Sequence, residues 1–291
     1  MLAEDGSNAS LDTANDFDHG MMLLQDGSRG VNFEMIGKFT PFQLIQLAEQ
    51  LSENTTCTTL KLSDLSLNDG DAETIAGFIK ENKTLTDLFL SKNNIGDKGM
   101  TFIAKGLESN STLKELSLWH NNIGDKGAEA FAKVLKDNKS LLSCILSENQ
   151  IGDMGMIALC KNLKSNKTIR SLDIGKNNFT RNSTKSLVSL LKSNKHITSV
   201  WLTDSKLTNS CAADIASALR SNSHITFMML PSDLTEENTI QEIQRICDQN
   251  NKTAMLKMGM KIKSKSSGQV APETFKKDED FYGGRNRLES F

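Results

Sequence analysis

The sequence lacks most features that mark secreted, membrane-spanning or metal-binding proteins. Its five cysteines are scattered, odd in number and never spaced as CxxC, which argues against a disulfide framework and against a zinc site. No apolar run approaches the roughly 18 residues that a membrane span needs. The N-terminus has neither the basic residues nor the apolar stretch of a signal peptide. We therefore expect a cytoplasmic protein, with the nucleus as the alternative, and no membrane partner.

Signatures of catalysis are missing as well. No serine lies in a nucleophile elbow, no glycine-rich loop is placed to bind phosphate, and the histidines show no metal-ligand spacing. The net charge of −2 gives no general case for binding nucleic acid. The sequence therefore predicts no enzymatic activity, no cofactor, no metal and no nucleic-acid partner.

What the sequence has instead is a repeat with a period of about 28 residues. One copy runs through Leu85, Leu88, Leu90, Asn93, Ile95, Gly99, Ile103, Leu107 and Asn110. The pattern recurs from Leu113, Leu141, Ile169 and Ile197, and weaker copies begin at Cys57 and Ile225. Each copy joins a strand-like LxxLxL half to a half with helical spacing, so stacked copies predict a parallel sheet and a helical layer.

Helices are wider than strands, so the stack must curve with its strands on the inside. The units SKNNIGDKGMTFIAKGLESNSTL and WHNNIGDKGAEAFAKVLKDNKSL resemble ribonuclease-inhibitor-type leucine-rich repeats, over about residues 57–253. The resemblance implies an α/β fold, a curved leucine-rich-repeat solenoid (horseshoe) with parallel strands on the concave face and helices on the convex face. Strands are expected near residues 58–62, 86–90, 114–118, 142–146, 170–174, 198–202 and 226–230.

The expected domain organisation has five segments. Residues 1–28 are acidic and polar, which predicts a disordered tail. Residues 29–56 form an N-terminal helical cap, opened by a capping box at Thr40-Pro41-Phe42-Gln43. Residues 57–253 form seven repeats, and residues 254–263 form a capping strand because Met255, Met258 and Met260 repeat the strand spacing. Residues 264–291 form a disordered polar tail.

Two polar positions have predicted structural roles. The asparagine that follows each strand would point inward and bond to backbone groups of neighbouring turns, at Asn93, Asn121, Asn149 and Asn177. The position becomes Ser205 and then Asp233, so this ladder weakens toward the C-terminus. Asp97 is expected to cap the first turn of the helix in its own repeat.

The concave face is the candidate site. Aromatic residues are 5% of the chain, yet both tryptophans fall on positions that have no core role. The candidate partner-binding residues are Phe89, Trp119, His120, Ile145, Trp201, Phe227 and Met229. Exposed aromatic side chains there indicate a contact surface. The alternatives are a chance scatter, or a face covered by the terminal tails. The charged concave residues are mixed in sign, which disfavours a nucleic-acid groove.

The leading hypothesis is a non-catalytic protein–protein interaction module, a monomeric scaffold or regulator that binds a protein partner of unknown identity on its concave face. One alternative is a GTPase-activating regulator resembling Ran GTPase-activating proteins, although Lys98 and Lys126 stand where those proteins use a loop arginine. The other is an actin-capping, tropomodulin-like protein, because tropomodulins end in a similar short solenoid and the segment LKSNKT is similar to their helix ends.

Overall fold

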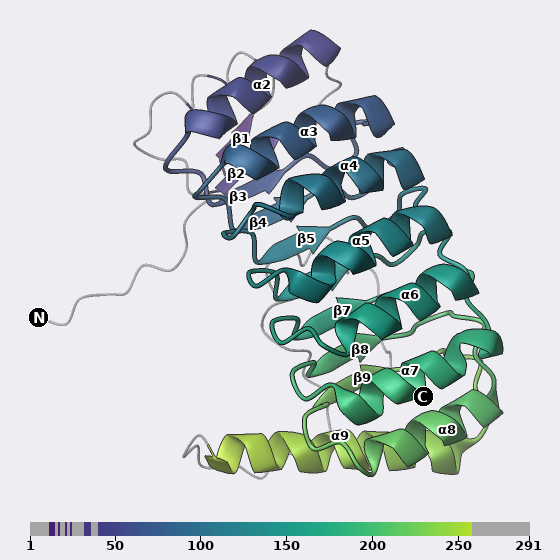
Figure 1. The fold of residues 1–291 in the computed structure, drawn as a ribbon. Helices are drawn as coiled ribbons and strands as arrows, with labels where there is room; N and C mark the ends of the chain where they lie inside the picture. Colours follow the sequence, from purple (N-terminus) through teal and green to yellow (C-terminus); the bar gives the residue numbers. More distant parts are fainter. Residues whose placement is uncertain are drawn as a thin grey trace, which may run out of the picture.

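The computed structural model of the chain describes residues 12–14, 17, 21, 24, 32–35 and 40–257. Within these residues, short strands form one parallel sheet in which each strand lies beside the next in sequence order. The helices form a single layer over one face of this sheet (Figure 1). The chain is therefore the curved α/β solenoid that the repeat predicts, with its strands on the concave side and its helices on the convex side.

The strands are β1 (Asp12–Ala14), β2 (Asn32–Met35), β3 (Thr59–Lys61), β4 (Asp87–Phe89), β5 (Glu115–Ser117), β6 (Ser143–Ile145), β7 (Ser171–Asp173), β8 (Ser199–Trp201) and β9 (Phe227–Met229). The helices are α2 (Pro41–Glu53), α3 (Asp69–Glu81), α4 (Asp97–Leu107), α5 (Asp125–Asp137), α6 (Asp153–Leu163), α7 (Thr184–Ser193), α8 (Asn209–Leu219) and α9 (Glu237–Lys257). A 3₁₀ turn, η1 (Arg181–Ser183), precedes α7. None of these helices is both long and apolar enough to span a lipid bilayer.

All seven predicted repeat strands, β3 to β9, are confirmed. Each lies inside its expected segment, and neighbouring strands pair one repeat apart, as in Leu60 with Leu88 and Leu88 with Leu116. The central residue of each strand points into the layer between sheet and helices, where Leu88 and Leu116 are almost fully buried. The apolar pattern thus determines which residue of every strand enters the core.

The helix that the capping box predicts within residues 29–56 is confirmed, as helix α2. Thr40 is its N-cap residue: the Gln43 backbone N–H donates to Thr40 Oγ1 at 3.3 Å, and the Thr40 N–H donates to Gln43 Oε1 at 3.0 Å. Pro41 occupies the first helical turn, where a missing N–H costs nothing. The predicted apolar face is buried, at Leu44, Leu47, Ala48 and Leu51.

Two strands that the repeat pattern does not predict precede this helix. Strand β1 pairs with β2, and β2 pairs with β3, so the sheet extends past the first repeat. The expectation of a disordered tail over residues 1–28 is wrong for Asp12–Ala14, and Phe17, Met21 and Leu24 pack against the core. The remaining residues of that segment lie outside the described residues. Composition misses such strands because an open sheet edge pairs through backbone groups, whatever side chains the added strand carries.

The expected capping strand is wrong where the structure describes it. Residues 254–257 belong to α9, which is 21 residues long and ends at Lys257. The rest of that segment, 258–263, and the polar tail at 264–291 lie outside the described residues. The Met spacing there satisfies a strand pattern and a helix pattern alike, because short apolar runs do not separate the two.

The inward asparagines join consecutive repeats. Asn121 Oδ1 accepts the Ile95 N–H at 3.0 Å, and its Nδ2 donates to the carbonyl oxygens of Leu90 at 2.9 Å and Leu118 at 3.2 Å. Asn93, Asn149 and Asn177 make the same kinds of bond. The predicted ladder is therefore confirmed, and each asparagine satisfies buried backbone groups of its own repeat and the one before.

The first aspartate of α3, of α4 and of α5 caps the following helix rather than its own, so the expectation for Asp97 is wrong. Asp97 Oδ1 accepts the backbone N–H groups of Gly124 at 2.7 Å and Gly127 at 2.8 Å, at the start of α5. A Cβ atom at Gly127 would lie 2.9 Å from that oxygen, so the position requires glycine. Capping rules that are applied to sequence consider one helix at a time. In the stacked repeats, the N–H groups at the start of the next helix lie within hydrogen-bond distance of the aspartate.

We expect Leu116→Ala to lower the free energy of unfolding by about 2–5 kcal/mol, because it removes buried apolar surface and leaves a cavity in a central repeat. Chemical denaturation of the full chain measures the change. The control is Leu142→Ala, since Leu142 is 39% exposed and its loss should cost about 0.5 kcal/mol or less. Equal midpoints for the two variants would contradict the inward assignment of Leu116.

Asn121→Ala is expected to cost about 1–3 kcal/mol, because buried backbone groups of two repeats lose their partner. The matched control is the adjacent Asn122→Ala, whose exposed side chain only accepts a 3.3 Å bond from Gln150. Denaturant midpoints report both. If Asn122→Ala proves as destabilising as Asn121→Ala, the inter-repeat hydrogen bonds of the asparagine ladder do not stabilise these turns.

Candidate protein-binding surface

The seven candidate residues all lie on the concave side, at strands or just after them. Phe89, Ile145 and Trp201 end strands β4, β6 and β8. Phe227 and Met229 begin and end β9, and the structure places Trp119 and His120 just beyond β5. The sheet therefore gathers them on one face, as the register predicts.

Their expected exposure is wrong for most of them. Phe89, Ile145, Trp201 and Phe227 are between 2% and 7% exposed. Trp201 packs on Phe227 of the neighbouring strand, with ring centroids 4.8 Å apart. Adjacent strands lie about 4.8 Å apart, and Phe227 is a diagonal neighbour of Trp201 on the same face of the sheet, so these large side chains cover one another. Trp119 and Met229 are half-buried, and only His120 is exposed.

The turns after the strands put a column of side chains along the edge of the concave face. Lys92, His120, Glu148 and Lys176 all have left-handed backbone, with φ between 49° and 55°. Such φ values are unfavourable for residues with a Cβ. Each turn recovers a hydrogen bond to the next repeat; the Lys92 N–H donates to the Trp119 carbonyl at 2.8 Å, for example. The inter-repeat bonds thus set where these side chains project.

We call this surface the concave rim: Lys61, Phe89, Lys92, Trp119, His120, Glu148 and Lys176. Its members interact across repeats. The Lys61 ammonium lies 5.7 Å from the Phe89 ring centroid, and that of Lys92 lies 5.2 Å from the Trp119 ring centroid. These are cation–π contacts, which leave the lysines partly available to a partner. The regular spacing of the charged positions was visible in the sequence, but their pairing was not.

One end of the concave rim is a cluster of three hydrogen-bonded side chains. His120 Nδ1 lies 2.9 Å from Glu148 Oε2, and Lys176 donates to the other oxygen of Glu148. Partial burial raises the pKa of Glu148, but the hydrogen bonds from Lys176 and His120 outweigh it and hold that pKa below its usual value. Glu148 therefore stays ionised at neutral pH and orders the side chains of both neighbours along the rim.

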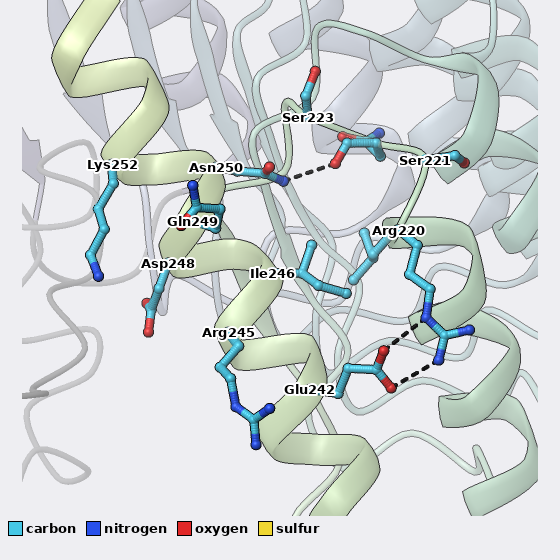
Figure 2. A pocket seen from close by; sticks show the side chains of 12 residues that line it. Arg220, Ser221, Ser223, Glu242, Arg245, Ile246, Asp248, Gln249, Asn250 and Lys252 are labelled. Atoms are coloured by element: carbon cyan, nitrogen blue, oxygen red, sulfur yellow. Dashed lines mark hydrogen bonds and ion pairs between the residues drawn. The ribbon is translucent and has the colours of Figure 1, made fainter.

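An open pocket of about 740 Å³ lies elsewhere, between the end of α8 and helix α9 (Figure 2). Across it, Arg220 Nε donates to Glu242 Oε1 at 2.8 Å and Nη2 donates to Oε2 at 3.1 Å. This ion pair is exposed, and such pairs contribute little to stability. Within the described residues, no group of three or more His, Cys, Asp or Glu side chains could hold a metal ion.

The five cysteines are free and buried. Burial raises the pKa of Cys57, Cys160 and Cys247, each to about 12, and raises that of Cys144 as well. These four thiols are therefore protonated at neutral pH, as expected for packed side chains rather than nucleophiles. At Cys211, burial raises the pKa but hydrogen bonds with Thr184 and Thr208 lower it further than burial raises it.

Comparison with known families identifies the repeats. A model described as "TMOD/LMOD Leucine-rich domain" matches residues 25–122, and a model described as "Leucine Rich repeat" matches residues 137–160. The chain therefore contains leucine-rich repeats. No curated protein is significantly similar to it in sequence.

Solved structures with some likeness include two of this type. One is described as "Leiomodin-1 Actin-Binding Site 2 (ABS2)"; it is 20% identical, with 56% of this chain and 78% of that chain covered and a TM-score of 0.37. The other is a Caenorhabditis elegans tropomodulin C-terminal domain; it is 13% identical, with 65% of this chain and 98% of that chain covered and a TM-score of 0.42.

The two tryptophans should differ in their contribution to stability. We expect Trp201→Ala to lower the free energy of unfolding by about 3–5 kcal/mol, because a large buried side chain is lost. Trp119→Ala should cost less, about 1 kcal/mol, because this side chain is half-buried and its contacts include the cation–π contact with Lys92. Denaturant titration of the two variants measures both. A neutral Trp201→Ala would mean that this side chain is not packed in the folded chain in solution.

Proposed function

We propose that the chain is a non-catalytic, actin-binding leucine-rich-repeat protein. The observation that carries the proposal is the match of residues 25–122 to a model of the tropomodulin and leiomodin leucine-rich domain. Leiomodin-1 has a domain described as an actin-binding site. We also infer that the repeats are of ribonuclease-inhibitor type, since a strand and a full α-helix alternate in every repeat, and that the protein acts in the cytoplasm as a monomer.

The N-terminal half of the concave rim is the surface we assign to actin. Lys61, Phe89, Lys92 and Trp119 all fall within the matched residues 25–122. Trp119 is half-buried and Lys92 is exposed, so both remain accessible, in contrast to Trp201. An aromatic ring flanked by a lysine suits a partner that offers an apolar side chain and a carboxylate together, and interface anchors are enriched in tryptophan.

The GTPase-activating alternative gains no support from the described residues. Lys98 and Lys126 lie in the first turns of α4 and α5, on the convex side, and the Lys98 ammonium lies 5.9 Å from the Phe102 ring centroid. Neither position is a strand-end loop from which a side chain would reach a nucleotide on the concave face.

Co-sedimentation of the full chain with actin filaments, together with pull-down of monomeric actin, tests the proposal. We expect binding to at least one actin form, and we expect Trp119→Ala to weaken it by roughly 2 kcal/mol or about 30-fold. Trp119→Ala should weaken binding because it removes the half-buried aromatic anchor, and the charged groups around it then lose their apolar neighbour.

The matched control is the pair Lys105→Ala with Lys133→Ala, on the exposed face of α4 and α5. This pair removes two positive charges from the convex side and should leave binding unchanged. No binding to either actin form would refute the proposed partner. Binding that is lost in the convex pair but kept in Trp119→Ala would place the contact on the helical layer instead.

A further inference from the structure

One column of core residues ends with a side chain that is exposed to solvent. The central residues of strands β3 to β9 succeed one another at the repeat period, and all are between 0% and 4% exposed: Leu60, Leu88, Leu116, Cys144, Leu172, Val200 and Met228. The next member of this column is Leu256. It lies in the last turn of α9 and is 63% exposed. A leucine thus occupies the core position of an eighth repeat strand while its backbone is helical.

The asparagine that follows the earlier helices is also present in this repeat, as Asn250, but it does not end the helix. Asn222 Oδ1 accepts the N–H groups of His224 at 2.7 Å and Ile225 at 2.9 Å, which ends α8 and directs the chain into β9. Asn250, one repeat later, donates to the carbonyl oxygens of Asn222 and Ile225, both at 2.9 Å. Figure 2 shows Asn250 at the wall of the open pocket, where a dashed line marks the first of these two bonds. The helix nevertheless continues to Lys257.

The weak point of this extra helix is its junction with the earlier part of α9. Asn250, Asn251 and Thr253 have low helix propensity, whereas Ala254, Met255, Leu256 and Lys257 are good helix formers. The parallel sheet ends beside this segment of the chain. Its strand order ends at β9, and within the described residues no strand pairs with the far side of Phe227–Met229. Among the residues that the structure describes, a strand edge without a partner and an exposed leucine in a core position therefore lie one repeat apart.

We propose that residues 251–257 are a latent strand: they alternate between the last two turns of α9 and a tenth strand that pairs, within the same molecule, with the open edge of β9. In the paired state, residues 255–257 take the register that β9 takes on β8, with Met255 beside Phe227 and Lys257 beside Met229. Leu256 then enters the core column. The switch closes the sheet edge and removes the end of α9 from the surface, and it requires no partner protein.

A disulfide trap tests the pairing. Paired residues on neighbouring strands lie about 4.8 Å apart, within the range of Cα separations that a disulfide spans. The double variant Met229→Cys with Lys257→Cys should therefore form a bond inside the monomer under a mild oxidant, seen as a mobility shift on a non-reducing gel. The matched control, Met229→Cys with Leu256→Cys, should not, because residue 256 faces the opposite side of the strand.

Two exposed substitutions should move the equilibrium in opposite directions. Added to the trap, Asn251→Ala favours the helix and should slow cross-linking about threefold, whereas Lys252→Gly disfavours it and should speed cross-linking about threefold. A cross-link confined to the Lys257 pair and responding in this way supports the proposal. No monomer cross-link, equal cross-linking in the control pair, cross-links only between two molecules, or no response to the two substitutions would overturn it.

Discussion

The inter-repeat hydrogen bonds of the asparagine ladder are the constraint on which the rest of the structure depends. Every repeat must leave its strand through a buried turn, and the backbone groups of that turn have no strand to pair with. Asn121 satisfies groups of its own repeat and of the preceding one, so each turn is held at a set distance from its neighbours. Insertion of a single residue would move the asparagine away from its partners, which is why the period of the repeat is kept so strictly.

The candidate binding surface is a consequence of this ladder. To bond with the next repeat, the chain enters a left-handed conformation directly before the asparagine, at Lys92 and again at His120. That conformation turns long side chains out along one edge of the sheet, where they meet residues from the adjacent repeat. Lys92 lies over Trp119, and Glu148 joins His120 to Lys176. The rim is therefore made by stacking, and no single repeat contains it.

The distinction between features of a single repeat and features made by stacking also separates what the sequence could predict from what it could not. The period alone located β3 to β9 and the core residue of each, because these depend on residues within one repeat. It misjudged Asp97 and Trp201 because their surroundings come from another repeat: Asp97 caps α5, and Trp201 packs on Phe227. It missed β1 and β2 because they pair by backbone groups at an edge and carry no copy of the pattern.

The ladder also explains why the two ends of the solenoid behave differently. At the N-terminal end, α2, β1 and β2 extend and cover the first repeat. At the C-terminal end the asparagine is replaced by Ser205, whose hydroxyl donates to the Leu202 carbonyl within its own repeat. This column of inter-repeat bonds therefore stops just before β9, although Asn222 and Asn250 still bond across repeats through their side chains. Residues 251–257 have an alternative strand register available and a leucine that is exposed to solvent. Such a segment is more easily accommodated at this end than in a central repeat. In a central repeat, a change of register would break the asparagine hydrogen bonds to two neighbouring repeats at once.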